Sequence, residues 1–150
     1  MKPDIQISLL GIQNAGSEPE AILTNTTGTY CFENGFHKIH YCELDITGTA
    51  TDNLLFLSGT EMRLSKSGSI AGQFFFVPGK RTVADYLTPF GKIDFGVETE
   101  SYRLDMKEDE LNVRLKYRLY TGNQLFSENT MTIQICEDGL GSINKRRKHL

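Results

Sequence analysis

Residues 26–43 read TTGTYCFENGFHKIHYCE, and this stretch predicts the β-hairpin from which the rest of the fold can be worked out. Apolar and polar residues alternate on both sides of Asn34-Gly35, a dipeptide that suits the positive φ angles of a two-residue type I′ turn. With that turn, pairing should run from Glu33 opposite Phe36 back to Thr26 opposite Glu43. The aromatic face should point inward. It carries Tyr30, Phe32, His37, Ile39, Tyr41 and Glu43, so a carboxylate is expected among inward-facing aromatic rings.

The rest of the chain repeats the period-two alternation, interrupted at short intervals by Gly, Asn, Asp and Pro. A turn at Glu108-Asp109 pairs Leu104 with Val113, and a bulge or a three-residue loop in the last hairpin is needed to set Val113 opposite Ile133. Other strands are expected over residues 5–13, 22–33, 36–46, 53–57, 61–67, 70–77, 81–88, 92–98 and 127–136. About ten strands with short turns predict an all-β, up-and-down antiparallel β-barrel that closes on itself, and a two-sheet sandwich is the alternative.

The composition is typical of one soluble globular domain, with 150 residues, 39% hydrophobic residues and a net charge of −3. The longest apolar runs have four residues, against about 20 for a membrane-spanning helix, and the N-terminus lacks a signal-peptide pattern. We therefore expect a cytoplasmic protein. Cys31, Cys42 and Cys136 show no C-x-x-C spacing and the three histidines no H-E-x-x-H pattern, so we expect reduced thiols, no metal and no cofactor.

We divide the chain into a barrel domain over residues 1–138 and a flexible basic tail over residues 139–150. The tail holds Lys145, Arg146, Arg147, Lys148 and His149, which would contact nucleic acid only weakly at physiological salt. No other feature predicts a nucleic-acid or membrane partner. The run at residues 74–76, Phe-Phe-Phe, cannot face inward as a whole, so one ring meets solvent, a covering loop or a second copy in a homodimer.

Short motifs follow one another along the chain: Thr27-Gly28, Tyr41-x-Glu43, Thr47-Gly48, Lys66-Ser67-Gly68, Pro78-Gly79, YLTPFG at residues 86–91, Val97-Glu98-Thr99 and NTMTI at residues 129–133. In this order they resemble the YwiB-like family of bacterial proteins of unknown function, over about residues 4–136. The resemblance implies a lipocalin-like, calycin-like barrel and no established activity. Where the family commonly has Arg-Ser-Gly, this chain has Lys66, and lysine lacks the planar fork that clamps an anion.

Glu43 is the centre of the predicted site, because an inward carboxylate costs on the order of several kcal/mol when it is desolvated and unpaired. Candidate partners lie on strands with inward faces, and Thr88 could add a second hydroxyl beside Tyr86. We predict a ligand-binding site made of Tyr41, Glu43, Lys66, Tyr86, Thr88 and Tyr117, which would orient a small, largely apolar ligand inside the barrel. Three alternatives stay open: Glu43 solvated at the barrel mouth, an enzyme that uses the same cluster for proton transfer with no assignable catalytic residue, and an interaction protein with a filled barrel.

Overall fold

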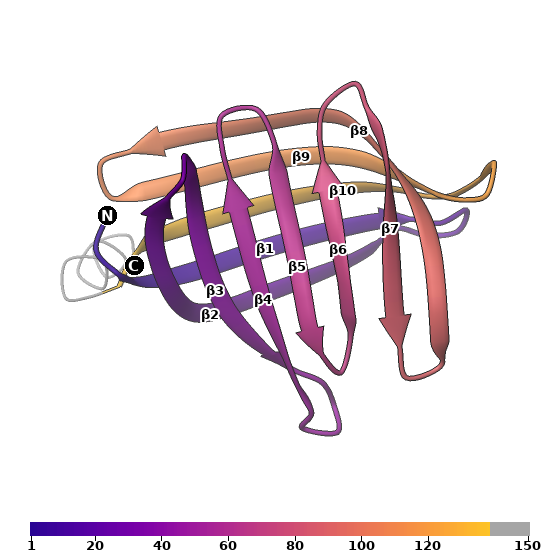
Figure 1. The fold of residues 1–150 in the computed structure, drawn as a ribbon, viewed down its shortest axis with the longest axis horizontal. Helices are drawn as coiled ribbons and strands as arrows, with labels where there is room; N and C mark the ends of the chain where they lie inside the picture. The colour runs from indigo at the N-terminus through magenta and orange to yellow at the C-terminus, as the bar shows by residue number, and fades with distance from the viewer. Residues whose placement is uncertain (139–150) are drawn as a thin grey trace.

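Ten antiparallel strands, joined in chain order by short turns, close into one barrel in which β1 also pairs with β10 (Figure 1). The computed structural model describes residues 1–138. Its strands are β1 (Asp4–Asn14), β2 (Glu20–Glu33), β3 (Phe36–Leu44), β4 (Ala50–Leu57), β5 (Met62–Gly68), β6 (Ala71–Phe76), β7 (Arg81–Thr88), β8 (Gly91–Lys107), β9 (Glu110–Thr121) and β10 (Gln124–Glu137). The expected all-β, up-and-down antiparallel barrel of about ten strands is confirmed. Residues 1–138 form no helix that could span a membrane.

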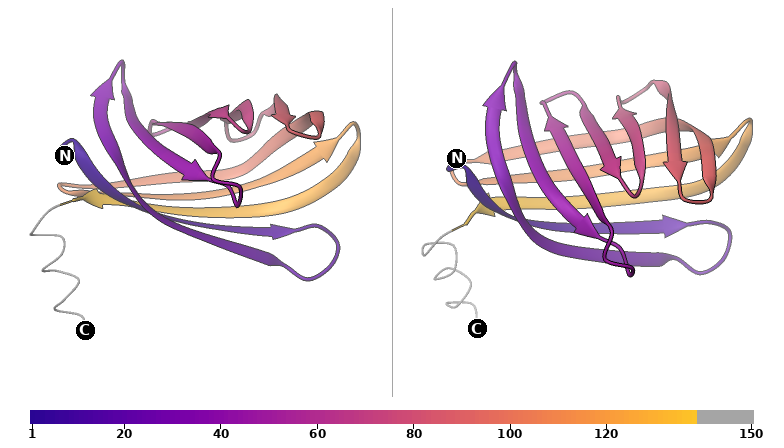
Figure 2. Two further views of the ribbon diagram at one scale, coloured as in Figure 1. Left: turned by 90° about the horizontal axis from the view of Figure 1, so that it is seen from below. Right: turned by 60° about the horizontal axis from the view of Figure 1, so that its bottom comes forward.

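The barrel has two walls of different strand length. Strands β1, β2, β8, β9 and β10 have 11 to 17 residues and curve together along one wall. Strands β3 to β7 have 6 to 9 residues and cross over them as the opposite wall (Figures 1 and 2). The expected tail, residues 139–150, lies outside the described residues.

The hairpin at Asn34-Gly35 forms as predicted near its turn and differs farther away. Asn34 has a φ of 53° and Gly35 of 82°, as a type I′ turn requires, and pairing runs as far as Thr29 opposite His40. The predicted pairing on to Thr26 and Glu43 is wrong, because β2 stays with β1 down to Glu20 while β3 stays with β4 down to Leu44. The two strands diverge with their outer partners (Figure 2), so β2 and β3 are not paired beyond Thr29 and His40. Phe32, expected to face inward, is 60% exposed beside the turn.

In the two later hairpins, β8–β9 and β9–β10, β-bulges set the register of the strands. The pairs Leu104–Val113 and Val113–Ile133 are both confirmed, and the predicted irregularity in β10 lies between Leu125 and Ser127. The strand expected at residues 92–98 and the one before the Glu108-Asp109 turn form a single strand, β8. A second bulge, between Thr99 and Ser101, lies where the two parts join.

Core packing is uneven along the barrel. The half that contains the β2–β3 and β8–β9 turns is filled by branched aliphatic residues, among them Ile5, Ile7, Ile39, Leu57, Val113, Ile133 and Ile135. In the other half, some inward positions carry small residues, such as Gly11 on β1 and Thr24 on β2. Small residues at inward positions leave interior volume unfilled, and the candidate site lies there.

Candidate functional site

The open half of the barrel holds a cavity of about 390 Å³ lined by inward residues of every strand. Ile22 of β2 lines this cavity, yet 64% of its surface is exposed. The cavity therefore reaches solvent on the side where β2 and β3 part. A volume of this size falls within the range of small-molecule sites.

A three-residue polar cluster stands on one wall of the cavity, with one residue from each of β3, β4 and β5. The Lys66 ammonium donates to Glu43 Oε1 at 3.1 Å and to Asn53 Oδ1 at 2.8 Å. The Asn53 side chain also donates to Glu43 Oε1, at 2.6 Å. Asn53 is fully buried, whereas Glu43 and Lys66 line the cavity. The carboxylate and the ammonium are thus held in place from behind by a neutral amide.

Three tyrosines turn their rings to the same cavity, and burial raises the pKa of each hydroxyl. Burial is the main cause for Tyr41, with a further contribution from the Glu43 charge, and the same two causes act on Tyr86. Burial alone raises the pKa of Tyr117 to about 12. All three hydroxyls are therefore protonated donors at neutral pH.

These hydroxyls have no hydrogen-bond partner among the residues that the structure describes, although the Tyr41 side chain is only 4% exposed. By comparison, Tyr30 and Tyr102, outside the cavity, do find partners. The Tyr30 hydroxyl lies 2.7 Å from His37 Nδ1, and the Tyr102 hydroxyl donates to the Ser58 carbonyl at 2.7 Å. The three cavity hydroxyl oxygens are not among the buried atoms that lack a partner, which within residues 1–138 are Gln6 Oε1 and Thr99 Oγ1, so they are accessible from the cavity. Water or a bound molecule can hydrogen-bond them there.

An unbroken series of aromatic rings forms a second side of the cavity, which begins on β6, the strand next to the polar cluster. The series runs Phe126, Phe95, Tyr86, Phe74, Phe76, Tyr117, with neighbouring ring centroids 5.5, 6.3, 5.5, 6.2 and 4.8 Å apart. Phe74 and Phe76 lie nearly parallel, with 6° between their planes. Five strands, β6 to β10, contribute to this wall. The cavity thus has a polar side and an aromatic side.

The structure brings five of the six predicted site residues, Tyr41, Glu43, Lys66, Tyr86 and Tyr117, to this one cavity. Thr88 does not belong with them. Its hydroxyl donates to the Gly91 carbonyl and accepts from the Phe90 amide, so it closes the β7–β8 turn, where Phe90 is fully exposed. Thr88 is not among the residues that line the cavity, and the turn uses its hydroxyl, so a ligand-binding role for Thr88 stays a prediction.

Sequence reasoning missed Asn53 and the phenylalanines of the aromatic wall. A signal was present for Asn53: it stands in phase with Leu55 and Leu57 in an alternating stretch, so it should face inward with them. Of the phenylalanines in the 74–76 run, Phe74 and Phe76 face the cavity, and Phe75 faces outward beside the Arg63 guanidinium, 5.9 Å from its ring. A homodimer contact through Phe75 stays a prediction.

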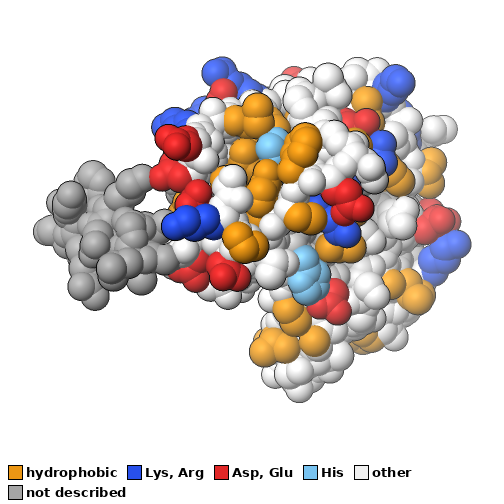
Figure 3. Space-filling model, turned by 60° about the vertical axis from the view of Figure 1, so that its left-hand side comes forward, with side chains coloured by type: hydrophobic (Ala, Val, Ile, Leu, Met, Phe, Trp, Pro, Cys, Tyr) orange, Lys and Arg blue, Asp and Glu red, His pale blue; other side chains and the backbone are white. Residues whose placement is uncertain are grey.

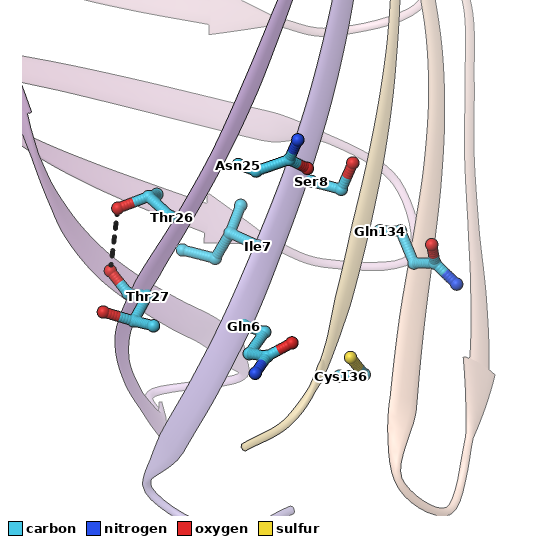
Figure 4. Close-up of a pocket in the computed structure, with 8 residues that line it drawn as sticks. All are labelled: Gln6, Ile7, Ser8, Asn25, Thr26, Thr27, Gln134 and Cys136. Atoms are coloured by element: carbon cyan, nitrogen blue, oxygen red, sulfur yellow. Dashed lines mark hydrogen bonds between the residues drawn. The ribbon is translucent and has the colours of Figure 1, made fainter. Parts of the chain in front are cut away.

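Two surface features lie apart from the cavity. On the face shown in Figure 3, hydrophobic side chains gather around the β2–β3 turn, where Phe32 contacts His37 and Met106 Sδ lies 3.1 Å from His37 Nε2. His37 is thus a bonded rim histidine. Figure 4 shows a hollow of about 430 Å³ on β1, β2 and β10, lined mainly by side-chain amides and hydroxyls such as Gln6, Asn25 and Gln134. Among residues 1–138, no Asp, Glu, Lys or Arg side chain lines this hollow, and neither feature includes a predicted site residue.

No group of three or more metal-ligating side chains occurs within residues 1–138. Asn53, Glu43 and Lys66 form a neutral assembly, and the tyrosines offer donors that remain protonated over the physiological pH range. Such an arrangement can orient a bound molecule by its polar groups.

Comparison with known proteins agrees with the motif pattern. Residues 5–133 match the family described as Domain of unknown function (DUF1934). An uncharacterized beta-barrel protein, YwiB of Bacillus subtilis (strain 168), is 28% identical over 123 residues, which is 81% of this chain and 84% of that protein. The crystal structure of the ywiB protein from Bacillus subtilis matches with a TM-score of 0.81 at 23% identity, over 91% of this chain and 93% of that one. The resemblance found in the motifs is thereby confirmed, as is the fold.

Proposed function

The chain belongs to the family of domains of unknown function DUF1934, and from that premise we propose that it is a binding protein that holds a small, largely apolar ligand inside its barrel. The cluster Glu43–Lys66 and the hydroxyls of Tyr41, Tyr86 and Tyr117 would orient that ligand. We also propose a lipocalin-like mode of action, in which an up-and-down barrel keeps an interior large enough for one small molecule.

One observation carries the proposal: unbonded tyrosine hydroxyls and an oriented ion pair face a cavity whose other surfaces are mostly apolar. An apolar site with a few placed polar groups is the common form of a small-molecule site. A barrel that served only as a scaffold could fill the same space with aliphatic side chains, as the other half of this barrel does.

The chemistry of the cluster supports binding over proton transfer. A general acid or base works best when its pKa lies near the working pH. Burial moves the pKa of Tyr41, Tyr86 and Tyr117 upward, away from neutrality. Glu43 already accepts two hydrogen bonds at Oε1, which suits an orienting role.

We further propose a cytoplasmic location. Cys31 and Cys42 are exposed and unbridged thiols on the outer side of β2 and β3. Cys31 lies opposite Lys38 in the ladder and not opposite Cys42. Exposed thiols without a bridge are typical of proteins kept in a reducing compartment.

Native mass spectrometry of the full chain, purified from its own cells under gentle conditions, tests the proposal. We expect a small molecule to travel with the wild-type protein. A substitution at Gly11 should exclude the small molecule, because Gly11 lines the cavity and a Cβ built there has nothing within 4 Å. The Gly11→Phe variant should fill the space and lose the extra mass.

The matched control is Leu10→Phe, since Leu10 is the neighbouring residue on the opposite face of β1 and is 37% exposed. The Leu10→Phe variant should retain the small molecule as the wild-type protein does. Equal retention by Gly11→Phe and wild type would place the molecule elsewhere, and a bare wild-type mass would favour the filled-barrel interpretation.

A further inference from the structure

We infer that the ligand is a flat aromatic molecule without net charge, with a hydrogen-bond donor and an acceptor close together on one edge. This inference rests on the proposed function and adds the chemical class of the ligand. Its flat faces would lie against the aromatic wall, and its polar edge would meet Glu43, Lys66, Tyr41 and Tyr86.

The preference for a flat molecule comes from the aromatic wall. Six rings follow one another without an aliphatic interruption, from Phe126 to Tyr117. Aliphatic side chains line the cavity as well, Leu55 and Leu64 from β4 and β5 and Leu119 and Met131 from β9 and β10. An aromatic ligand gains from stacked or edge-to-face contacts beyond its buried area, roughly two- to tenfold in affinity per ring pair. A saturated ligand of equal size gains affinity only from the apolar area that it buries.

The requirement for a polar edge comes from the bonds that the cluster leaves open. Lys66 uses two of its three donors, on Glu43 and Asn53. Glu43 accepts both of its bonds at Oε1, so Oε2 has no bond within residues 1–138. Tyr41 is two residues before Glu43 on the same face of β3, and Gly72 of β6 pairs with both Lys66 and Tyr86, so both tyrosines line the cavity beside the cluster. A ligand edge that both donates and accepts would satisfy Oε2 and one hydroxyl together.

The charge of the site favours a neutral molecule. Glu43 and Lys66 cancel each other at 3.1 Å, and no other ionised side chain of residues 1–138 lines the cavity. An anion would meet the nearby carboxylate, and a cation would meet the ammonium. Either would also lose its hydration in an apolar space, which a neutral molecule avoids.

Isothermal titration calorimetry of the full chain at pH 7 can test this with four related probes. They are 2-naphthol, its saturated counterpart decahydro-2-naphthol, naphthalene without the hydroxyl, and anionic 2-naphthoate. We expect 2-naphthol to bind roughly tenfold more tightly than each of the other three. If none of the four binds, the proposed function fails. If 2-naphthol and decahydro-2-naphthol bind equally, the proposed function holds and the aromatic inference is overturned.

Two variants locate the effect on the wall and on the edge. Phe74→Leu should remove the preference for 2-naphthol over decahydro-2-naphthol, whereas Phe75→Leu, on the outer face of the same strand, should keep it. Tyr86→Phe should weaken 2-naphthol and leave naphthalene unchanged. Its control is Tyr102→Phe, whose lost hydroxyl bonds a carbonyl outside the cavity. Equal effects of a variant and its control would overturn the inference.

Discussion

Asn53 should stabilise the fold through the two charged groups that it holds, and Asn53→Leu tests this directly. Leucine has the same number and branching of side-chain heavy atoms as asparagine, so the change removes hydrogen bonds without opening a cavity. The side chain is fully buried, donates to Glu43 at 2.6 Å and accepts from Lys66 at 2.8 Å.

The expected loss follows from those two bonds. A hydrogen bond to a charged group contributes about 1.5–3 kcal/mol, so the pair contributes about 3–6 kcal/mol. Burying the leucine side chain returns about 1.5–3 kcal/mol. The net fall in the free energy of unfolding should be about 2 kcal/mol, which shifts a urea midpoint by about 1 M at an m-value near 2 kcal/mol per M. Unfolding can be followed by far-UV circular dichroism.

Two further variants separate the hydrogen bonds from packing. Asn25→Leu, at an exposed strand position of β2, should change stability by less than about 0.5 kcal/mol. The triple variant Glu43→Leu, Asn53→Leu, Lys66→Met replaces the whole cluster by apolar groups and should return to within about 1 kcal/mol of wild type, because no charge is left unpaired. A triple variant less stable than Asn53→Leu alone, or equal effects at Asn53 and Asn25, would refute the reasoning.

Three other predictions concern register, pH and close packing. Leu115→Asp should lower the free energy of unfolding by more than about 3 kcal/mol and the adjacent outward change Lys116→Asp by less than about 1 kcal/mol, and equal urea midpoints would contradict the register. Because the pKa of Tyr117 is raised to about 12 in the folded protein, its hydroxyl ionises first in the unfolded chain, so stability should fall between about pH 10 and pH 12. Over that pH range the free energy of unfolding of Tyr117→Phe should fall by roughly 2–3 kcal/mol less than that of the wild type. Parallel curves of unfolding free energy against pH for the two proteins would rule this out. Gly28→Ala should cost about 1–3 kcal/mol, since its Cβ would lie 2.3 Å from a carbonyl oxygen of β3, whereas Gly11→Ala, with open space, should cost little in the same thermal melts.

The sequence predicted local pairing well because local pairing has local causes. Asn34-Gly35 determines a turn type, the turn determines a register, and the period of two then determines which side chains share a face. The same reasoning predicts the pairing of the hairpin at Glu108-Asp109. The same reasoning predicts Glu43 as an inward carboxylate and makes Lys66 one of four candidate partners, with Tyr41, Tyr86 and Tyr117. The structure shows the bond between Lys66 and Glu43.

The divergence of β2 from β3 has no such local cause. Nothing between Glu20 and Gly28 marks a break, because β2 remains a regular strand there and keeps its pairing with β1. The separation arises from the two walls, which take different directions after Thr29 and His40. A consequence that depends on the curvature of a closed sheet is set by all the strands together, and hairpin arithmetic applied to one turn does not contain it.

The open side and the polar cluster depend on each other physically. Had β2 continued beside β3 as far as Glu43, the carboxylate would lie inside a closed barrel, where the cost of desolvating an ion pair rises steeply. With the strands apart, Glu43 and Lys66 remain within reach of water, while Asn53 behind them stays fully buried. The same separation gives the cavity its entrance beside Ile22. A ligand that enters there meets the charged cluster and the unbonded tyrosine hydroxyls in one space, and it can replace the water that those groups would otherwise bind.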